Sequence, residues 1–249
     1  MIDTAIEVAK QAGALAYQHF KTQLKVTYKP DDSPVTRADI EAEKLARKII
    51  SKKFPNHGII GEEFGSTNVG AKYKWTIDPI DGTRDFIRKS QFWATLISVL
   101  ENEKPIIGVA FFPTLDELFI AQKGKGCFFN GKKTKVSKIS SLKNAYIDLG
   151  SQLKHFAYKN KVREILEISQ RVQCIRNIAA YGYSLLLTGR ADGMIDASGG
   201  IWDFAAPAIL VEEAGGKFSD FSGKFCLTSE NGFFSNGLIH NQILKILNG

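Results

Sequence analysis

Apolar residues recur at helical spacing near the start of the chain, after the capping-box pattern Thr4-Ala5-Ile6-Glu7. This spacing predicts a first helix that ends near Lys21. A polar stretch at 29–34 with two prolines predicts a loop. Helical spacing returns from Ala42 to Ile50 and predicts a second helix.

Shorter apolar runs follow and predict strands at 59–60, 75–77, 94–100, 106–112 and 117–121. Asn130-Gly131 predicts a hairpin. Beyond it, strands expected at 146–149, 174–178 and 193–197 alternate with helices expected at 158–172, 181–187 and 239–247. Such alternation predicts an α/β layer structure. The polar, lysine-rich stretch 137–143 predicts a boundary between an N-terminal half, 1–138, and a C-terminal half, 139–249.

One more helix is expected after Gly199-Gly200, and it contains Pro207. Proline has no backbone N–H to donate within a helix, so we expect Pro207 in the first turn. That position would make Asp203 the N-cap residue.

Charge and cysteine content narrow the class of protein. The net charge of +7 is scattered along the chain, which is typical of a solvated surface and favours anionic small molecules over a nucleic-acid partner. Three cysteines stand far apart, as free thiols do in a reducing cytoplasm. The amphipathic N-terminus is unlike a signal peptide, and the apolar runs are too short to span a bilayer. We therefore expect a cytoplasmic protein without membrane contact.

The segment Trp75 to Ile87 reads W-T-I-D-P-I-D-G-T-R-D-F-I and contains Asp78, Asp81 and Asp85. Carboxylates this close repel one another unless one is protonated or a cation lies between them. A solvated acidic turn is one interpretation, and a divalent metal site is the other.

Two further acidic positions lie at the ends of predicted elements: Glu62 within G-E-E-F-G and Asp203 before a helix. Oxygen ligands without histidine or cysteine favour magnesium or manganese over zinc. Gly82 and Thr83 can offer backbone N–H groups to a phosphate at a helix start. Metal ligands beside an anion site indicate phosphoryl chemistry.

Three motifs in order resemble the signatures of the inositol monophosphatase family. They are G-E-E at 61–63, W-x-I-D-P-I-D-G-T-x-x-F at 75–86, and W-D-x-A-A-P-A-x-x-V-x-E-A-G-G at 202–216. The resemblance implies an α/β fold, the layered α-β-α-β-α sandwich of the sugar phosphatases. Inositol monophosphatase and fructose-1,6-bisphosphatase have this type of fold. It also implies a homodimer, inhibition by lithium, and two or three Mg²⁺ ions.

The resemblance also implies roles for individual residues. A first ion would be held by Glu62, Asp78, the Ile80 carbonyl and the Thr83 hydroxyl. Asp78 would bridge to a second ion held by Asp81 and Asp203, and Glu62 would bind a third through water. Asp39 would hydrogen-bond Thr83 and help to activate the attacking metal-bound water. Lys29 and Asp32 match a mobile loop that closes over the site in the family.

The substrate is less closely defined by these motifs. Asp196 and Ala179 match substrate contacts of the family. We expect Arg84, Asp81 and Asp203 to contact the substrate as well. D-G-T-R-x-F-I and Y-x-Y-x-L-L are similar to the histidinol-phosphate phosphatase branch, whereas Trp202-Asp203 has the inositol-type form. We expect a magnesium-dependent phosphomonoesterase acting on a sugar-alcohol phosphate, narrowly favouring inositol 1-phosphate over histidinol phosphate. A non-catalytic regulatory binding module is a further alternative, opposed by the intact set of ligand positions.

Overall fold

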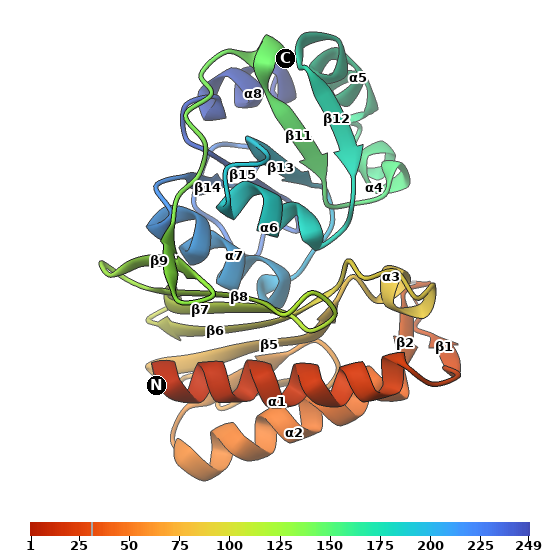
Figure 1. Ribbon diagram of the computed structural model, residues 1–249, viewed down its shortest axis with the longest axis vertical. Helices are drawn as coiled ribbons and strands as arrows, with labels where there is room; N and C mark the ends of the chain where they lie inside the picture. Colours follow the sequence, from red (N-terminus) through yellow and green to blue (C-terminus); the bar gives the residue numbers. More distant parts are fainter. Residues whose placement is uncertain (31) are drawn as a thin grey trace.

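The computed structural model describes residues 1–30 and 32–249, and they form five stacked layers (Figure 1). Helices α1 (Ile2–Phe20) and α2 (Arg37–Lys53) form the first layer and cover one face of an eight-stranded sheet. Helices α6 (Tyr181–Leu187) and α7 (Ile201–Glu213) lie between this sheet and a five-stranded sheet. Helices α4 (Leu153–Tyr158), α5 (Val162–Arg171) and α8 (His240–Leu247) cover the outer face. The α-β-α-β-α sandwich implied by the resemblance is confirmed.

The eight-stranded sheet has the order β10-β9-β8-β7-β6-β5-β3-β4. Its members are β3 (Gly58–Gly61), β4 (Gly65–Thr67), β5 (Tyr73–Asp81), β6 (Ala94–Glu101), β7 (Lys104–Phe112), β8 (Glu117–Gln122), β9 (Gly126–Phe129) and β10 (Lys132–Thr134). Neighbouring strands are antiparallel except β3 and β5, which run parallel with Gly61 opposite Ile77. This parallel pair brings the ends of two acidic motifs to the same edge.

The five-stranded sheet has the order β12-β11-β13-β15-β14. Its members are β11 (Tyr146–Leu149), β12 (Cys174–Asn177), β13 (Gly193–Asp196), β14 (Lys217–Ser219) and β15 (Gly232–Ser235). Strand β11 runs parallel to both β12 and β13, so the chain leaves all three at one end of the sheet. Residues that follow β11 and β12, and those at the end of β13, therefore lie close together.

Some local predictions were wrong. Helix α1 begins at Ile2, before the capping-box pattern. The loop expected at 29–34 is confirmed for its described residues up to residue 33, between the antiparallel strands β1 (Val26–Tyr28) and β2 (Pro34–Thr36), whereas Pro34 belongs to β2 and Asp31 lies outside the described residues. The helix expected at 158–172 begins only at Val162, as α5, because Asn160 has a left-handed φ of 54° that a continuing helix does not allow. Helix α4, which ends at Tyr158, was not predicted. In the described part of the chain, no helix is both long and apolar enough to cross a membrane.

The expected N-cap position of Asp203 was also wrong. Helix α7 begins at Ile201 with Gly200 as N-cap, so Asp203 is the third helical residue and Pro207 lies inside the helix. A proline there costs about 3 kcal/mol in an isolated helix. Residues 204–211 are all buried, and we attribute the tolerance of Pro207 to this packing between the two sheets.

The sheet approaches α7 most closely at Gly108 on β7. A Cβ atom at this position would lie 2.5 Å from Ile209 Cγ2 and 2.7 Å from the Ala206 carbonyl oxygen. We expect Gly108→Ala to lower the free energy of unfolding by about 1–3 kcal/mol, because the helix must move away from the sheet. Urea denaturation measures the change.

Gly70→Ala is the matched control, because a Cβ atom at Gly70 meets nothing within 4 Å. It should change the free energy of unfolding by less than about 0.5 kcal/mol. Equal stability of the two variants would contradict the assigned contact between α7 and β7.

Candidate functional site

Three carboxylates from two distant segments meet where β5 ends and α7 begins. One side-chain oxygen from each of Asp78, Asp81 and Asp203 can be chosen so that all lie within 4.8 Å of one another. Asp78 and Asp81 flank an irregularity in the pairing of β5 with β6, which interrupts the regular alternation of side chains there. Asp203 reaches the cluster from the first turn of α7, where its carboxylate accepts a hydrogen bond from Gly200 N at 2.5 Å.

Asp78 provides the clearest test of a metal site. Its side chain is buried, and its Oδ1 accepts a hydrogen bond from Ile80 N at 2.9 Å. Its Oδ2 is buried without a hydrogen-bond partner among the described residues. A buried, unsatisfied carboxylate oxygen is costly unless a cation binds it. The oxygen-only donors of this cluster fit magnesium or manganese.

Glu62 lies directly after β3. Its backbone N–H donates to the Ile77 carbonyl at 3.2 Å, which places Glu62 beside the start of the D-P-I-D segment. Its Oε1 accepts a hydrogen bond from Lys29 Nζ at 2.9 Å, and Lys29 also donates to Glu63 at 2.8 Å. Burial alone would lower the pKa of Lys29, but the two carboxylates outweigh it and raise that pKa. Lys29 therefore remains charged and partly compensates the acidic cluster.

Crowding and burial raise the pKa of each acid in the cluster. Burial has the larger effect on Asp78 and Asp81, and repulsion from the neighbouring carboxylates adds to it, so both pKa values lie well above the ordinary range. Burial and the charge of Glu62 raise the pKa of Asp203 to about 8. Burial also raises the pKa of Glu62, although Lys29 opposes the shift. The charge of Lys29 offsets only part of this negative charge, so the cluster favours the binding of divalent cations.

Thr83 and Asp39 are arranged differently from the implied pattern. The Thr83 hydroxyl donates to the Ile80 carbonyl at 3.0 Å rather than to Asp39. Asp39 Oδ2 accepts from the backbone N–H and the hydroxyl of Thr36, at 2.8 and 2.6 Å, and so caps α2. Asp39 Oδ1 is buried without a hydrogen-bond partner among the described residues, and burial raises the pKa of Asp39 to about 6. One oxygen of Asp39 thus remains available for a further hydrogen bond.

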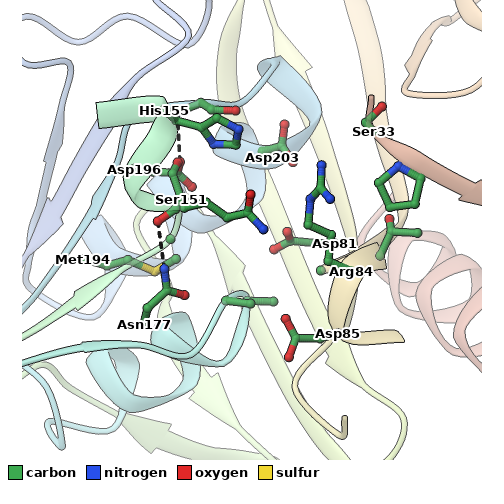
Figure 2. A pocket seen from close by; sticks show the side chains of 18 of the residues that line it. Ser33, Asp81, Arg84, Asp85, Ser151, His155, Asn177, Met194, Asp196 and Asp203 are labelled. Carbon is green, nitrogen blue, oxygen red and sulfur yellow. Dashed lines mark hydrogen bonds between the residues drawn. The ribbon is translucent and has the colours of Figure 1, made fainter. Parts of the chain in front are cut away.

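A cavity of about 300 Å³ opens beside the cluster, and the remaining candidate residues line it. Figure 2 shows Asp81, Asp203 and Arg84 on one side of this cavity and Asp196, Ser151 and Asn177 on the other. Gly82, Thr83 and Ala179 also line it. Arg84 reaches across to the β1–β2 connection, where its guanidinium donates to the Asp32 carbonyl at 3.0 Å.

Asp196 is held at the far side of the cavity from the cluster. Its Oδ1 accepts hydrogen bonds from the Ser151 hydroxyl and, at 3.0 Å, from Ser198 N. Burial raises its pKa to about 6, and these two hydrogen bonds oppose the shift. A Cβ atom at residue 150 would lie 2.5 Å from Asp196 Oδ2, so the glycine before Ser151 leaves room for this carboxylate.

Ser151, His155 and Asn177 also line the cavity, although the sequence did not single them out. Asn177 is the last residue of β12, and Ser151 follows the end of β11. Their places at the ends of two parallel strands are the signal that could have identified them.

Comparison with known proteins gives a consistent result. A model described as the inositol monophosphatase family matches residues 1–248. A histidinol-phosphatase of Chlorobaculum parvum is 35% identical, with 100% of this chain and 97% of the relative covered. A fructose-1,6-bisphosphatase/inositol-1-monophosphatase of Thermotoga maritima is 34% identical, with 99% and 95% covered.

Solved structures agree with these sequence relatives. The extragenic suppressor protein suhB of Bartonella henselae has a TM-score of 0.91 and 29% identity, with 98% of this chain and 97% of that chain covered. An IMPase of Thermotoga maritima has a TM-score of 0.89 and 34% identity, with 99% and 96% covered.

Neutralising one acid tests whether the cluster needs cations. We expect Asp81→Asn to stabilise the metal-free protein by roughly 0.5–2 kcal/mol, because it removes one of the mutually repelling charges. The same change should remove most of the rise in melting temperature that magnesium produces in the parent protein. Thermal unfolding with EDTA and with magnesium measures both effects.

Asp85→Asn is the control, since Asp85 lines the cavity but does not belong to the cluster. Its response to magnesium should equal that of the parent protein. An Asp81→Asn protein with an undiminished magnesium response would contradict the site.

The raised pKa of Asp203 predicts how stability depends on pH. The folded, metal-free protein keeps this proton up to about pH 8, whereas the unfolded chain releases it near 3.8. The free energy of unfolding should therefore fall as the pH rises from about 4 to about 8. Urea denaturation with EDTA at about pH 5.5 and about pH 8.5 measures this fall. Asp203→Asn should reduce it, and an unchanged pH dependence in that variant would contradict the assignment.

Proposed function

The chain belongs to the inositol monophosphatase family, and from that premise we propose that it hydrolyses the phosphate ester of a small cationic alcohol, with histidinol phosphate as the substrate. It is a phosphoric monoester hydrolase whose family uses metal ions such as Mg²⁺. The choice of a cationic substrate rests on one observation. Besides the proposed metal ligands, two acids line the cavity, Asp85 and Asp196, and neither has an ion-pair partner among the described residues.

The charge balance of the cavity supports this choice. Two or three divalent ions would neutralise the ligand group of Glu62, Asp78, Asp81 and Asp203. Asp196 lies across the cavity from that group, and its charge would remain (Figure 2). A substrate ammonium group would satisfy it through a charge-assisted hydrogen bond.

The names of similar proteins point to the same two candidates that the sequence left open. The relatives from Chlorobaculum parvum, Streptomyces coelicolor and Mycobacterium tuberculosis, at 35%, 34% and 32% identity, are each named histidinol-phosphatase. Inositol 1-phosphate, which the sequence narrowly favoured, is the second candidate. It is supported by the form of the Trp202-Asp203 pair and by the name of the Thermotoga relative.

The residues around the cluster suit in-line attack of water on a phosphate ester. Bound ions would neutralise the phosphate and activate the attacking water. We assign Glu62, Asp78, the Ile80 carbonyl and Thr83 to a first ion, and Asp78, Asp81 and Asp203 to a second, with Glu62 holding a third through water. The N–H groups at Gly82 and the start of α3 (Thr83–Ile87) would bind the phosphate, since first-turn N–H groups lack helical acceptors.

Asp39 and Thr83 would orient the attacking water. Asp39 Oδ1 lacks a hydrogen-bond partner among the described residues, so it can accept a hydrogen bond from the Thr83 hydroxyl once that hydroxyl turns from the Ile80 carbonyl. The Thr83 oxygen would then accept a hydrogen bond from the water and so direct the lone pair of the water to phosphorus. The bond between phosphorus and the alcohol oxygen would break, and the proton that the water loses would pass to the departing alcohol. Asp196 and Ala179 would contact the leaving alcohol, and Arg84 would close the cavity from the β1–β2 side.

We also propose a homodimer, which light scattering would test.

Phosphate release from a substrate panel tests the proposal. We expect kcat/KM at millimolar magnesium to be highest for histidinol phosphate among that ester, inositol 1-phosphate and glycerol 2-phosphate. Asp196→Asn should reduce kcat/KM for histidinol phosphate by roughly 10- to 100-fold, the usual worth of a hydrogen bond to a charged group. The decrease for glycerol 2-phosphate, which has no ammonium group, should be much smaller.

Two outcomes would contradict the proposal. A higher kcat/KM for inositol 1-phosphate than for histidinol phosphate would show that inositol 1-phosphate is the substrate. If Asp196→Asn lowers kcat/KM equally for all three esters, Asp196 does not recognise the ammonium group. Asp81→Asn, which lacks a metal ligand, should release almost no phosphate from any ester and provides the background rate.

A further inference from the structure

Glu43 on α2 is a buried carboxylate that contacts the loop after β3 and has no part in the mechanism above. Its side chain is completely buried, with 0% of its surface exposed. It accepts three hydrogen bonds: from Glu63 N at 2.7 Å, from Phe64 N at 3.2 Å and from Arg47 Nε at 2.7 Å. Two of these donors belong to the backbone that directly follows Glu62. A charged side chain is rarely buried unless it is paired, and here the partners belong to the loop that carries a metal ligand.

The packing at Gly61 shows how closely Glu43 approaches this loop. A Cβ atom at residue 61 would overlap Glu43 Oε1 and would lie 2.5 Å from the carboxyl carbon of Glu43. Glycine is therefore required there for the close approach of the carboxylate. Arg47 extends the contact, because its Nη2 donates to the Gly65 carbonyl.

Glu62 is consequently held from both sides. Its own N–H is bonded to Ile77 on β5, and the two N–H groups after it are bonded to Glu43 on α2. The backbone at Glu62 is therefore fixed relative to β5, the strand that carries Asp78. Ordered ligands bind a cation more tightly, because less conformational entropy is lost on binding.

We propose that Glu43 is a positioning residue, which sets the metal affinity of the site by holding the backbone of the loop that carries Glu62. The proposal rests on the proposed function, in which Glu62 is a metal ligand. Glu43 itself contacts neither ion nor substrate. Its effect therefore falls on the metal concentration that the enzyme needs, and much less on turnover once metal is saturating.

Glu43→Gln tests the proposal. The amide keeps one acceptor oxygen, but its NH₂ group replaces the other and must face at least one of the three N–H donors. Two donors cannot bond to each other, so at least one of the three hydrogen bonds is lost. We expect Mn²⁺ binding, measured by electron paramagnetic resonance of the free ion, to weaken by about 10- to 100-fold. The magnesium concentration for half-maximal activity should rise by the same factor, while kcat at saturating magnesium should stay within a few-fold of the parent value.

Glu41→Gln is the matched control. Glu41 lies two residues earlier on α2 and forms ion pairs with Arg37 and His19. Among the described residues it forms no hydrogen bond or ion pair with the loop after β3. Its Mn²⁺ affinity should equal that of the parent protein. If Glu43→Gln fails to fold, Arg47→Met tests the same contact, and we expect a smaller weakening of Mn²⁺ binding in the same direction.

The possible results separate the two hypotheses. If the parent protein binds no Mn²⁺, the proposed function fails. If the parent binds Mn²⁺ and folded Glu43→Gln, or Arg47→Met in its place, binds equally well, the positioning role fails while the proposed function stands. A lower melting temperature with unchanged metal affinity would likewise show that Glu43 only stabilises the fold.

Discussion

Repulsion among carboxylates is the constraint around which this structure is arranged. Asp78, Asp81 and Asp203 place oxygens within 4.8 Å of one another, and Glu62 adds a fourth charge whose effect is felt by all three. Such a cluster is unfavourable in a folded chain unless cations compensate it. Lys29 supplies a single positive charge, through Glu62 and Glu63. The negative charge that Lys29 leaves uncompensated explains the raised pKa values. It also explains why one buried oxygen of Asp78 has no partner among the described residues.

The layers of the fold hold these acids in place. The parallel pairing of β3 with β5 puts Glu62 beside Asp78, and the first turn of α7 brings Asp203 to the same point. Because α7 is packed between two sheets, the charges cannot separate without disrupting the core. Two buried carboxylates on α2 accept hydrogen bonds from backbone N–H groups: Glu43 from Glu63 after β3, and Asp39 from Thr36 before α2. The rigidity of the frame therefore maintains an arrangement that electrostatics alone would disperse.

The cavity beside the cluster has a different character. Its far wall comes from the five-stranded sheet, where residues at the ends of three strands meet. The cluster is assembled mainly from the first half of the chain, and the substrate side mainly from the second. This division agrees with the use of one family fold for several phosphate esters, since the far wall can change without altering the metal ligands.

The sequence by itself determined the chemistry and most of the elements. The motifs around Glu62, Asp78 and Asp203 identified the family, because oxygen ligands at element ends are a local property of the chain. Periodicity identified the two N-terminal helices and the central strands, because each buries one face. It failed at two places: Pro207 lies inside α7, where packing outweighs local preference, and the helix expected from residue 158 begins only after Asn160, which has a left-handed φ.

Only the tertiary structure decided how separate segments meet. No local pattern indicates that Glu43 reaches the loop after β3, because that contact depends on how α2 packs on the sheet. No local pattern indicates either that Ser151, Asn177 and Asp196 surround a single cavity. They lie close together because β11 pairs in parallel with both β12 and β13. The Thr83 hydroxyl binds Ile80 instead of Asp39 for a similar reason, because the choice among nearby acceptors is set by three-dimensional geometry. Local chemistry is encoded residue by residue, whereas proximity between distant segments follows from packing of the whole chain.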